Sequence, residues 1–198
     1  MKNIKASYGL TVFDIDDTIF KTNNKVYIIK NKIIKQKISS AEFAAYKLKK
    51  GETYDFSEFR DSRLFYEQAK PIREILKKIK TITKRIKRKK YSQIILLTAR
   101  KNMNNKSLFL KTFRNFGIDI DNIYIERAGN LNLEVHEAKK KIISKYLKKN
   151  IFSKVRLYDD QIKNLYSFLE LKSSFKEIKF MAYLVKNNEI KKVKPSEC

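Results

Sequence analysis

Leu10 to Thr18 read LTVFDIDDT, and this stretch places a short apolar run directly before three carboxylates. Such a run is typical of a strand buried on both faces, which is the environment of a parallel sheet. Ligands of these sheets bind just beyond the carboxyl ends of the strands. Crowded carboxylates repel one another and favour a cation, and oxygen-only ligands indicate a hard ion such as Mg²⁺. The simpler alternative is an acidic turn after an ordinary strand, because Asp is a common turn residue.

The chain is strongly basic. Its 198 residues include 46 Lys and Arg against 21 Asp and Glu, a formal net charge of +25, and 42% are hydrophobic. This length and hydrophobic content predict one folded domain over residues 1–198. The charge favours a polyanionic partner such as nucleic acid. A compositional origin stays open, because Lys greatly outnumbers Arg and because Ile and Asn are also plentiful, as an AT-rich coding sequence would produce.

The cysteine content and the hydropathy pattern indicate the cellular compartment. Cys198 is the only cysteine, so no intrachain disulfide can form and a reducing compartment is expected. The N-terminus lacks an uninterrupted apolar signal segment, and no stretch has the length of a membrane span. We therefore expect a cytoplasmic protein that does not associate with membranes, and no obligate protein partner is evident.

Apolar runs and amphipathic stretches alternate after the first strand. This alternation predicts an α/β fold with a doubly wound, mostly parallel sheet and right-handed crossovers. The expected strands are 93–97, 123–125, 155–158 and a late edge strand at 178–185, and the expected helices are 72–90 with Pro71 in the first turn, 108–116, 134–147 and 162–171.

Residues 21–70 break this alternation and predict a small inserted cap made of a hairpin and a helix. The hairpin is expected over residues 26–34, where apolar residues flank a polar Lys-Asn-Lys turn. Ser39 and Glu42 form a capping-box pattern, which predicts a helix that runs on to a stop at Gly51. The hairpin would lie close to the carboxylates, where a lid belongs.

Four strand or helix positions carry residues that suit one reaction, in a characteristic order. They are DIDDT at 14–18, LTAR at 97–100, a lysine within 134–147, and the pair Asp159-Asp160. This order resembles the four-motif signature of haloacid dehalogenase-like (HAD) phosphohydrolases, over roughly residues 10–171. The resemblance implies a HAD-like Rossmannoid core and an Mg²⁺-dependent phosphomonoesterase.

The resemblance also implies roles for the acidic residues. Asp14 would be the nucleophile that forms an aspartyl-phosphate, and Asp16 would be the general acid and base. Asp14, the main-chain carbonyl of Asp16 and the Asp159-Asp160 pair would hold Mg²⁺, with Asp159 the expected direct ligand. Asp17 replaces a glycine often found there and has no assigned task. Alternatively, Asp159 and Asp160 cap the helix that follows them.

Two further residues would bind the phosphoryl group. Thr98 would contact a phosphoryl oxygen through its hydroxyl and backbone N–H, and a lysine would balance the negative charge. Lys139 is the preferred lysine, because the first turn of the helix at 134–147 can meet phosphate, and Lys140 is the next choice. A surface position is the default alternative for either lysine.

Within the family, the chain is most similar to the 3′-phosphatase domain of phage polynucleotide kinase-phosphatases. This likeness implies that Arg100 and Arg127 lie near the substrate phosphate, although a structural role for either arginine stays open. An acidic residue expected one turn before the lysine falls at Val135, which departs from the pattern. No Gly-rich kinase loop precedes the phosphatase-like region, so a 5′-kinase activity is not expected.

The expected substrate is therefore a phosphorylated nucleic acid, specifically a polynucleotide 3′-phosphate end, which would place the protein in nucleic-acid repair. The basic segment 85–90 and the aromatic segment 54–66 could contact a single strand, or be a solvated helix end and a cap core. Two other functions stay open. One is a nucleotide or small-metabolite phosphatase, and the other is a basic nucleic-acid-binding protein on the same scaffold with little catalysis.

Overall fold

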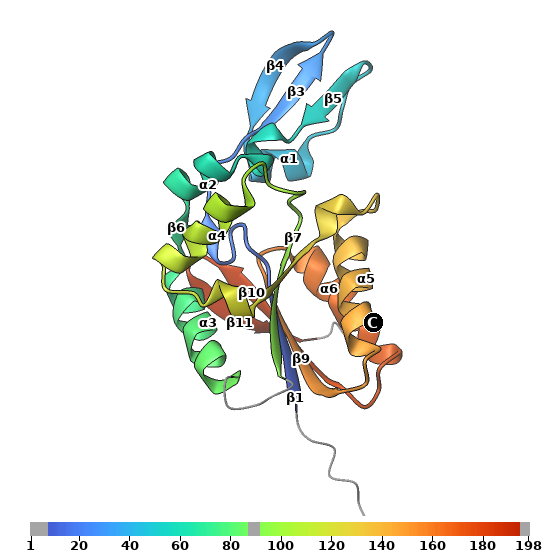
Figure 1. Ribbon diagram of the computed structural model, residues 1–198. Coiled ribbons are helices and arrows are strands. Elements are labelled where there is room, and N and C mark those ends of the chain that lie inside the picture. The colour runs from blue at the N-terminus through green and yellow to red at the C-terminus, as the bar shows by residue number, and fades with distance from the viewer. Residues whose placement is uncertain (1–7, 87–91, 195–198) are drawn as a thin grey trace, which may run out of the picture.

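A six-stranded sheet forms the centre of the computed structural model, which describes residues 8–86 and 92–194. The strand order is β11-β10-β9-β1-β7-β8 (Figure 1). All neighbouring strands pair in parallel except β10 and β11, which are antiparallel. The predicted α/β class with a mostly parallel sheet is confirmed. The strands are β1 (Tyr8–Phe13), β7 (Gln93–Thr98), β8 (Tyr124–Arg127), β9 (Phe152–Asp159), β10 (Lys179–Lys186) and β11 (Glu189–Val193).

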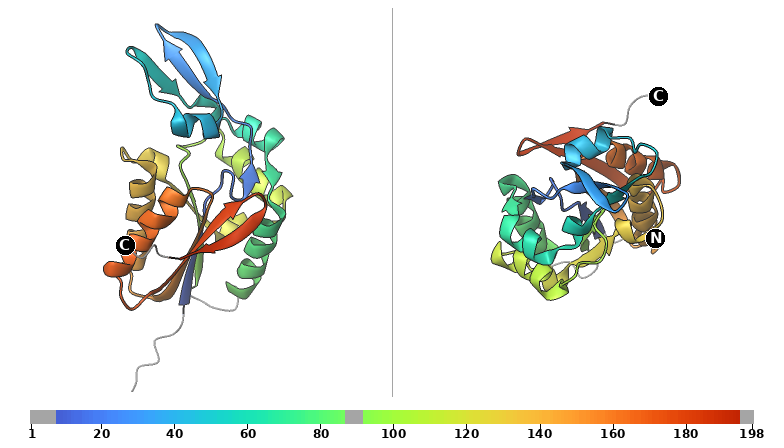
Figure 2. Two further views of the ribbon diagram at one scale, coloured as in Figure 1. Left: turned by 180° about the vertical axis from the view of Figure 1, so that it is seen from behind. Right: turned by 90° about the horizontal axis from the view of Figure 1, so that it is seen from above.

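Helices cover both faces of this sheet (Figures 1 and 2). On one face lie α3 (Arg73–Ile86) and α4 (Lys106–Asn115), and on the other lie α5 (Val135–Leu147) and α6 (Ile162–Glu170). The alternation of side chains along β1 explains why both faces are covered. Leu10 and Val12 are buried in the cluster that includes α5 and α6, whereas Phe13 is buried with α3 and α4.

A separate small sheet lies beyond the carboxyl ends of the central strands (Figures 1 and 2). It has the order β4-β3-β5 and its own buried cluster of Val26, Ile28 and Ile38. The chain enters and leaves this cap through a short antiparallel pair, β2 with β6. The cap elements are β2 (Phe20–Lys21), β3 (Val26–Lys30), β4 (Ile33–Ile38), α1 (Ser40–Ala45), β5 (Glu52–Asp55), α2 (Ser62–Gln68) and β6 (Lys70–Pro71).

The cap helix begins as expected but ends early. The predicted hairpin is confirmed as β3 and β4, with Asn31 and Lys32 at positive φ in the turn. The capping box is also confirmed, because the Ser39 hydroxyl and the Glu42 carboxylate each accept from the other's backbone N–H. The extension to Gly51 is wrong, since α1 ends at Ala45. The Tyr46 carbonyl instead accepts the Tyr54 hydroxyl at 2.9 Å, which ties the chain to β5.

Two other boundaries differ from the sequence prediction. Pro71 lies in β6 and not in the first turn of α3, because the chain is still paired with β2 there. β10 is not an edge strand, since Asn187 and Asn188 adopt positive φ and turn the chain back into β11. Part of the basic segment 85–90 lies outside the described residues. Short 3₁₀ turns at Ser57–Arg60, Ile120–Asn122, Ala128–Asn130 and Leu171–Ser173 complete the fold.

Candidate active site

Four neighbouring parallel strands carry the predicted site residues at their carboxyl ends. Asp14 follows β1 directly, while Thr98, Arg127 and Asp159 are the last residues of β7, β8 and β9. The Asp14 backbone N–H donates to the Tyr158 carbonyl at 2.9 Å, so the ladder between β1 and β9 continues to the carboxylates. The parallel pairing therefore brings these residues together at the carboxyl ends of the strands, beneath the cap (Figure 1).

Lys139 joins the two acidic motifs. Its Nζ donates to Asp14 Oδ1 and to Asp159 Oδ2, each at 2.7 Å. The lysine is only 3% exposed, and Asp14 and Asp159 are 4% and 0% exposed. Lys140 points elsewhere, because its Nζ lies 2.6 Å from Glu170 on the exposed side of α5. Of the two candidate lysines, Lys139 is therefore the one at the carboxylates.

Asp159 also contacts the start of α6, but the alternative interpretation of the acidic pair as helix caps is wrong, because the N-cap of α6 is Gln161 and no side chain caps the helix. Asp159 Oδ1 accepts from the Gln161 backbone N–H at 2.9 Å and from the Asn164 side-chain amide at 2.8 Å. Because Oδ2 accepts from Lys139, both oxygens of Asp159 are engaged within the protein. The contacts of Asp159 with the start of α6 and with Lys139 are thus compatible, since each uses a different oxygen. Among the described residues, the Asp160 carboxylate accepts a side-chain hydrogen bond from Gln161 only.

The carboxylates outnumber the cations in this cluster. Burial raises the pKa of Asp14 well above its ordinary range; Lys139 opposes this, and the charges of Asp159 and Asp160 add to it. Burial and the Asp159 charge raise the pKa of Asp160 to about 7. Burial disfavours the charged form of Lys139, but Asp14 and Asp159 outweigh it and raise the lysine pKa. One buried ammonium group is therefore shared by three carboxylates that repel one another.

Arg100 binds Asp16 and connects it to the cap. The guanidinium donates from Nε and Nη2 to the Asp16 carboxylate at 2.9 and 2.6 Å. It also donates to the Phe59 carbonyl at 3.0 Å and to the Asn24 amide oxygen at 2.8 Å, both in the cap. At 2% exposure, Arg100 is enclosed by these partners. Thr22 donates a further hydrogen bond to Asp16 at 3.2 Å.

The backbone after Asp16 turns sharply toward the cap. Asp17 has φ +55°, in the left-handed region that favours glycine and that Asp tolerates better than most residues. The Ile19 and Phe20 N–H groups both donate to the Ile15 carbonyl, at 2.9 and 3.0 Å, and close the turn. Thr18 is fully buried, and within residues 8–86 and 92–194 its hydroxyl has no hydrogen-bond partner.

Thr98 ends β7, the strand next to β1, whereas Arg127 ends β8, one strand further away. The buried Thr98 hydroxyl accepts from the Arg100 backbone N–H at 3.1 Å, which leaves its proton free to be donated to another acceptor. Arg127 donates to the Lys101 carbonyl at 3.0 Å and lies over the Phe109 ring, 4.9 Å from its centroid. The two arginines thus contact different parts of the protein.

Sequence reasoning missed the neutral residues that hold the charged ones. Asn24 accepts from Arg100, and Asn164 donates to Asp159. A signal existed for Asn164, because it falls in the first turn of the helix that follows the acidic pair. No comparable signal marks Asn24, whose position depends on how the cap folds onto the sheet.

The donor set of this cluster fits a hard divalent cation. The available ligands are carboxylate and carbonyl oxygens, and burial, with the neighbouring carboxylate charges adding to it, raises the pKa of Asp14 and of Asp160. In the described part of the chain, no three acidic, His or Cys side chains already converge as ligands of a metal ion. Asp14, the carbonyl of Asp16, Asp159 and Asp160 remain the candidate ligands.

Comparisons with known proteins place no constraint on the function. The chain matches no protein-family model, no curated protein and no solved structure. Among the residues described, no helix is long and apolar enough to cross a membrane.

Proposed function

We propose that the chain is an Mg²⁺-dependent phosphomonoesterase of the haloacid dehalogenase type, with the doubly wound core of that superfamily. The observation that carries the proposal is the buried Asp14–Lys139–Asp159 cluster, with 2.7 Å contacts, at the carboxyl ends of adjacent parallel strands. Asp16 lies two residues after Asp14 and forms a separate ion pair with Arg100. Two carboxylates in different environments suit two different chemical roles.

Asp14 is the nucleophile in this proposal. Its carboxylate oxygen attacks the phosphorus, the bond from phosphorus to the leaving oxygen breaks, and Asp16 protonates that oxygen. Asp16 then takes a proton from a water molecule, which attacks the phosphorus of the aspartyl-phosphate and releases inorganic phosphate. Lys139 orients Asp14 and offsets the negative charge of the phosphoryl oxygens, and the Thr98 hydroxyl donates to one of them.

Mg²⁺ would be held by Asp14, the Asp16 carbonyl and the Asp159-Asp160 pair, and when bound it offsets the repulsion between the carboxylates and the phosphate. Asp160 is the better candidate for the direct contact. Both oxygens of Asp159 are engaged by Lys139 and the start of α6, whereas Asp160 carries a raised pKa and, within the described part of the chain, has a single side-chain partner, Gln161. Asp159 then positions Lys139 and α6.

A polynucleotide 3′-phosphate end is the proposed substrate. The net charge of +25 supports a polyanionic substrate, because it raises the local concentration of phosphates and the rate of encounter. The likeness of the arginine positions to phage polynucleotide 3′-phosphatases supports the phosphorylated end. Arg100 acts in this proposal chiefly by holding Asp16 beneath the cap.

A substrate panel tests the proposal. A 3′-phosphorylated oligonucleotide, the same strand with a 5′-phosphate and a nucleoside monophosphate are each assayed for phosphate release, with Mg²⁺ and with chelator. We expect the 3′-phosphorylated strand to have the highest kcat/KM, only with Mg²⁺. Equal efficiency on the nucleoside monophosphate would indicate a small-metabolite phosphatase. No turnover on any substrate, with salt-sensitive binding of the strand, would indicate a binding protein.

A matched pair of variants assigns the activity to the cluster. Asp14→Asn removes the nucleophile and should abolish turnover while oligonucleotide binding persists. Asp17→Asn makes the same chemical change three residues away, at a position with no proposed task and a backbone that Asn also tolerates, and should keep activity. Turnover that survives Asp14→Asn would refute the proposed nucleophile.

A further inference from the structure

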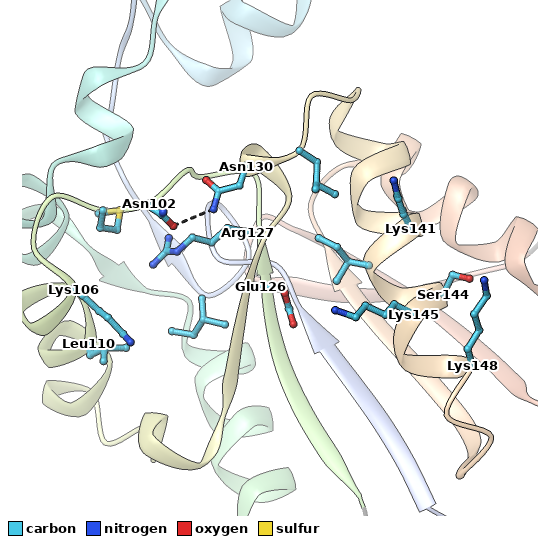
Figure 3. A pocket seen from close by; sticks show the side chains of 14 residues that line it. Asn102, Lys106, Leu110, Glu126, Arg127, Asn130, Lys141, Ser144, Lys145 and Lys148 are labelled. Atoms are coloured by element: carbon cyan, nitrogen blue, oxygen red, sulfur yellow. Dashed lines mark hydrogen bonds between the residues drawn. The ribbon is translucent and has the colours of Figure 1, made fainter.

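A second positively charged site lies outside the carboxylate cluster. A pocket of about 980 Å³ follows edge strand β8, between α4 and α5 (Figure 3). We call it the β8 pocket. Its charged lining consists of five cations and one carboxylate: Lys106, Arg127, Lys141, Lys145, Lys148 and Glu126.

The lysines of the β8 pocket have no anionic partner among the residues that the structure describes. Within residues 8–86 and 92–194, none of the four lysines forms an ion pair or donates a side-chain hydrogen bond. The carboxylate of Glu126 is engaged, since it accepts the Tyr146 hydroxyl at 2.6 Å. Four like charges around one hollow repel one another, and an anionic ligand would relieve that repulsion.

The floor of the β8 pocket is apolar. Leu110 of α4, Ile125 of β8 and Ile142 of α5 contribute half-buried side chains to it. β8 has a described strand neighbour only on its β7 side, so the pocket follows an open sheet edge. The lysines suit phosphates and the aliphatic side chains offer apolar contact to flat base faces, and a single-stranded polynucleotide carries both groups. An acidic peptide would satisfy the lysines but would bring no such flat faces.

The β8 pocket shares two elements, the end of β8 and helix α5, with the surroundings of the carboxylate cluster. Arg127, which lines the pocket, pairs in register with Thr98 on β7. α5 connects the two sites as well, because Lys139 is buried against Asp14 while Lys141, two residues on, is exposed in the pocket. A polynucleotide whose phosphorylated end lies at Asp14 can therefore extend across Arg127 and along α5 toward Lys148.

We infer that the β8 pocket binds the polynucleotide strand on the 5′ side of the phosphorylated end. The polarity of the strand rests on the proposed 3′-phosphatase function. The binding of the strand itself rests on the unpaired lysines and the apolar floor. The two parts can be tested separately, because strand binding is measurable without turnover.

The test is the salt dependence of binding, measured by fluorescence anisotropy with chelator present. The probe is a 3′-phosphorylated single-stranded DNA of about ten nucleotides. K141Q/K145Q removes two pocket lysines, and K172Q/K176Q removes two exposed lysines outside the pocket as the matched control. Each phosphate contact on a single strand contributes about 0.7 to the slope of log K against log salt, so the pocket variant should lose about 1.4 of slope. The control should keep the wild-type slope.

Three results would overturn the inference. Equal loss of slope in both double variants would show that only net charge matters, and an unchanged slope in both would place the strand elsewhere. Equal competition by poly-glutamate of the same charge would show that the bases contribute nothing. None of these outcomes depends on phosphate release, so a protein that binds the strand in the β8 pocket but lacks turnover would refute the proposed function alone.

Discussion

Replacing Lys139 by Met should destabilise the protein strongly. Met keeps the apolar stem but removes the ammonium group, so Asp14 and Asp159 lose their 2.7 Å partner while they stay buried. Removing one partner of a buried ion pair costs about 3–5 kcal/mol of unfolding free energy. For a urea slope of about 3 kcal/mol per M, the midpoint of unfolding should fall by about 1–1.7 M.

Lys140→Met is the matched control for this measurement. Lys140 is the next residue of the same helix, but its contact with Glu170 is largely exposed, with 28% and 60% of the two side chains accessible. Exposed pairs of this kind contribute about 0–1 kcal/mol. The control should therefore shift the midpoint by less than about 0.3 M. Both variants are unfolded in urea at pH 8 with chelator and followed by circular dichroism.

The pH dependence separates a lost charge from a simple packing defect. Asp14 already has a raised pKa, and removing Lys139 removes the charge that opposes this rise, so the loss of stability should be largest at pH 8 and smaller at pH 5. Mg²⁺ should restore part of the stability that the Lys139→Met variant loses. If Lys139→Met costs no more than Lys140→Met at pH 8, or the same amount at both pH values, the reasoning is refuted.

Three further predictions concern neighbouring residues. Asp17→Gly should be more stable than Asp17→Ala by about 1 kcal/mol, or about 2–4 °C in Tm, because φ is +55° there; equal Tm values would contradict this. Arg100→Lys should lower the unfolding free energy by about 2–3 kcal/mol, because Lys cannot reproduce the contacts to Asp16 and the cap, and a change within 0.5 kcal/mol would disprove that role. The folded protein holds the Asp160 proton up to about pH 7, whereas the unfolded chain releases it near 3.8. Metal-free stability should therefore fall as pH rises from about 4 to 7, and Asp160→Asn should weaken this dependence and leave the part that the raised pKa of Asp14 contributes; an identical pH profile of the urea midpoint in the variant would show the assignment is wrong.

The central elements could be predicted from local pattern. The apolar runs at 10–13 and 93–97 alternate between the two helical layers, and burial on both faces leaves parallel strands as the consistent arrangement. Asp14, Thr98 and Asp159 lie together at the carboxyl ends of the strands because of that arrangement alone, since parallel strands end on the same side of the sheet.

The contacts that depend on the cap could not be predicted in this way. Arg100 reaches Asp16, the Phe59 carbonyl and Asn24, and the last two are placed by long-range packing of the inserted segment. The early end of α1 also depends on a contact with β5 that no local signal encodes. β11 is a different case, because the turn that leads into it is marked locally by Asn187-Asn188, a residue pair that favours positive φ.

The most direct test of the central claim is to identify the residue that carries the covalent phosphate. The protein is mixed with a 3′-phosphorylated oligonucleotide and Mg²⁺, quenched in acid within the first turnover, and digested for peptide mass spectrometry. The account predicts a phosphorylated carboxylate at Asp14, absent from the Asp14→Asn variant. Phosphate on another residue, or steady turnover with no covalent species at any quench time, would contradict it.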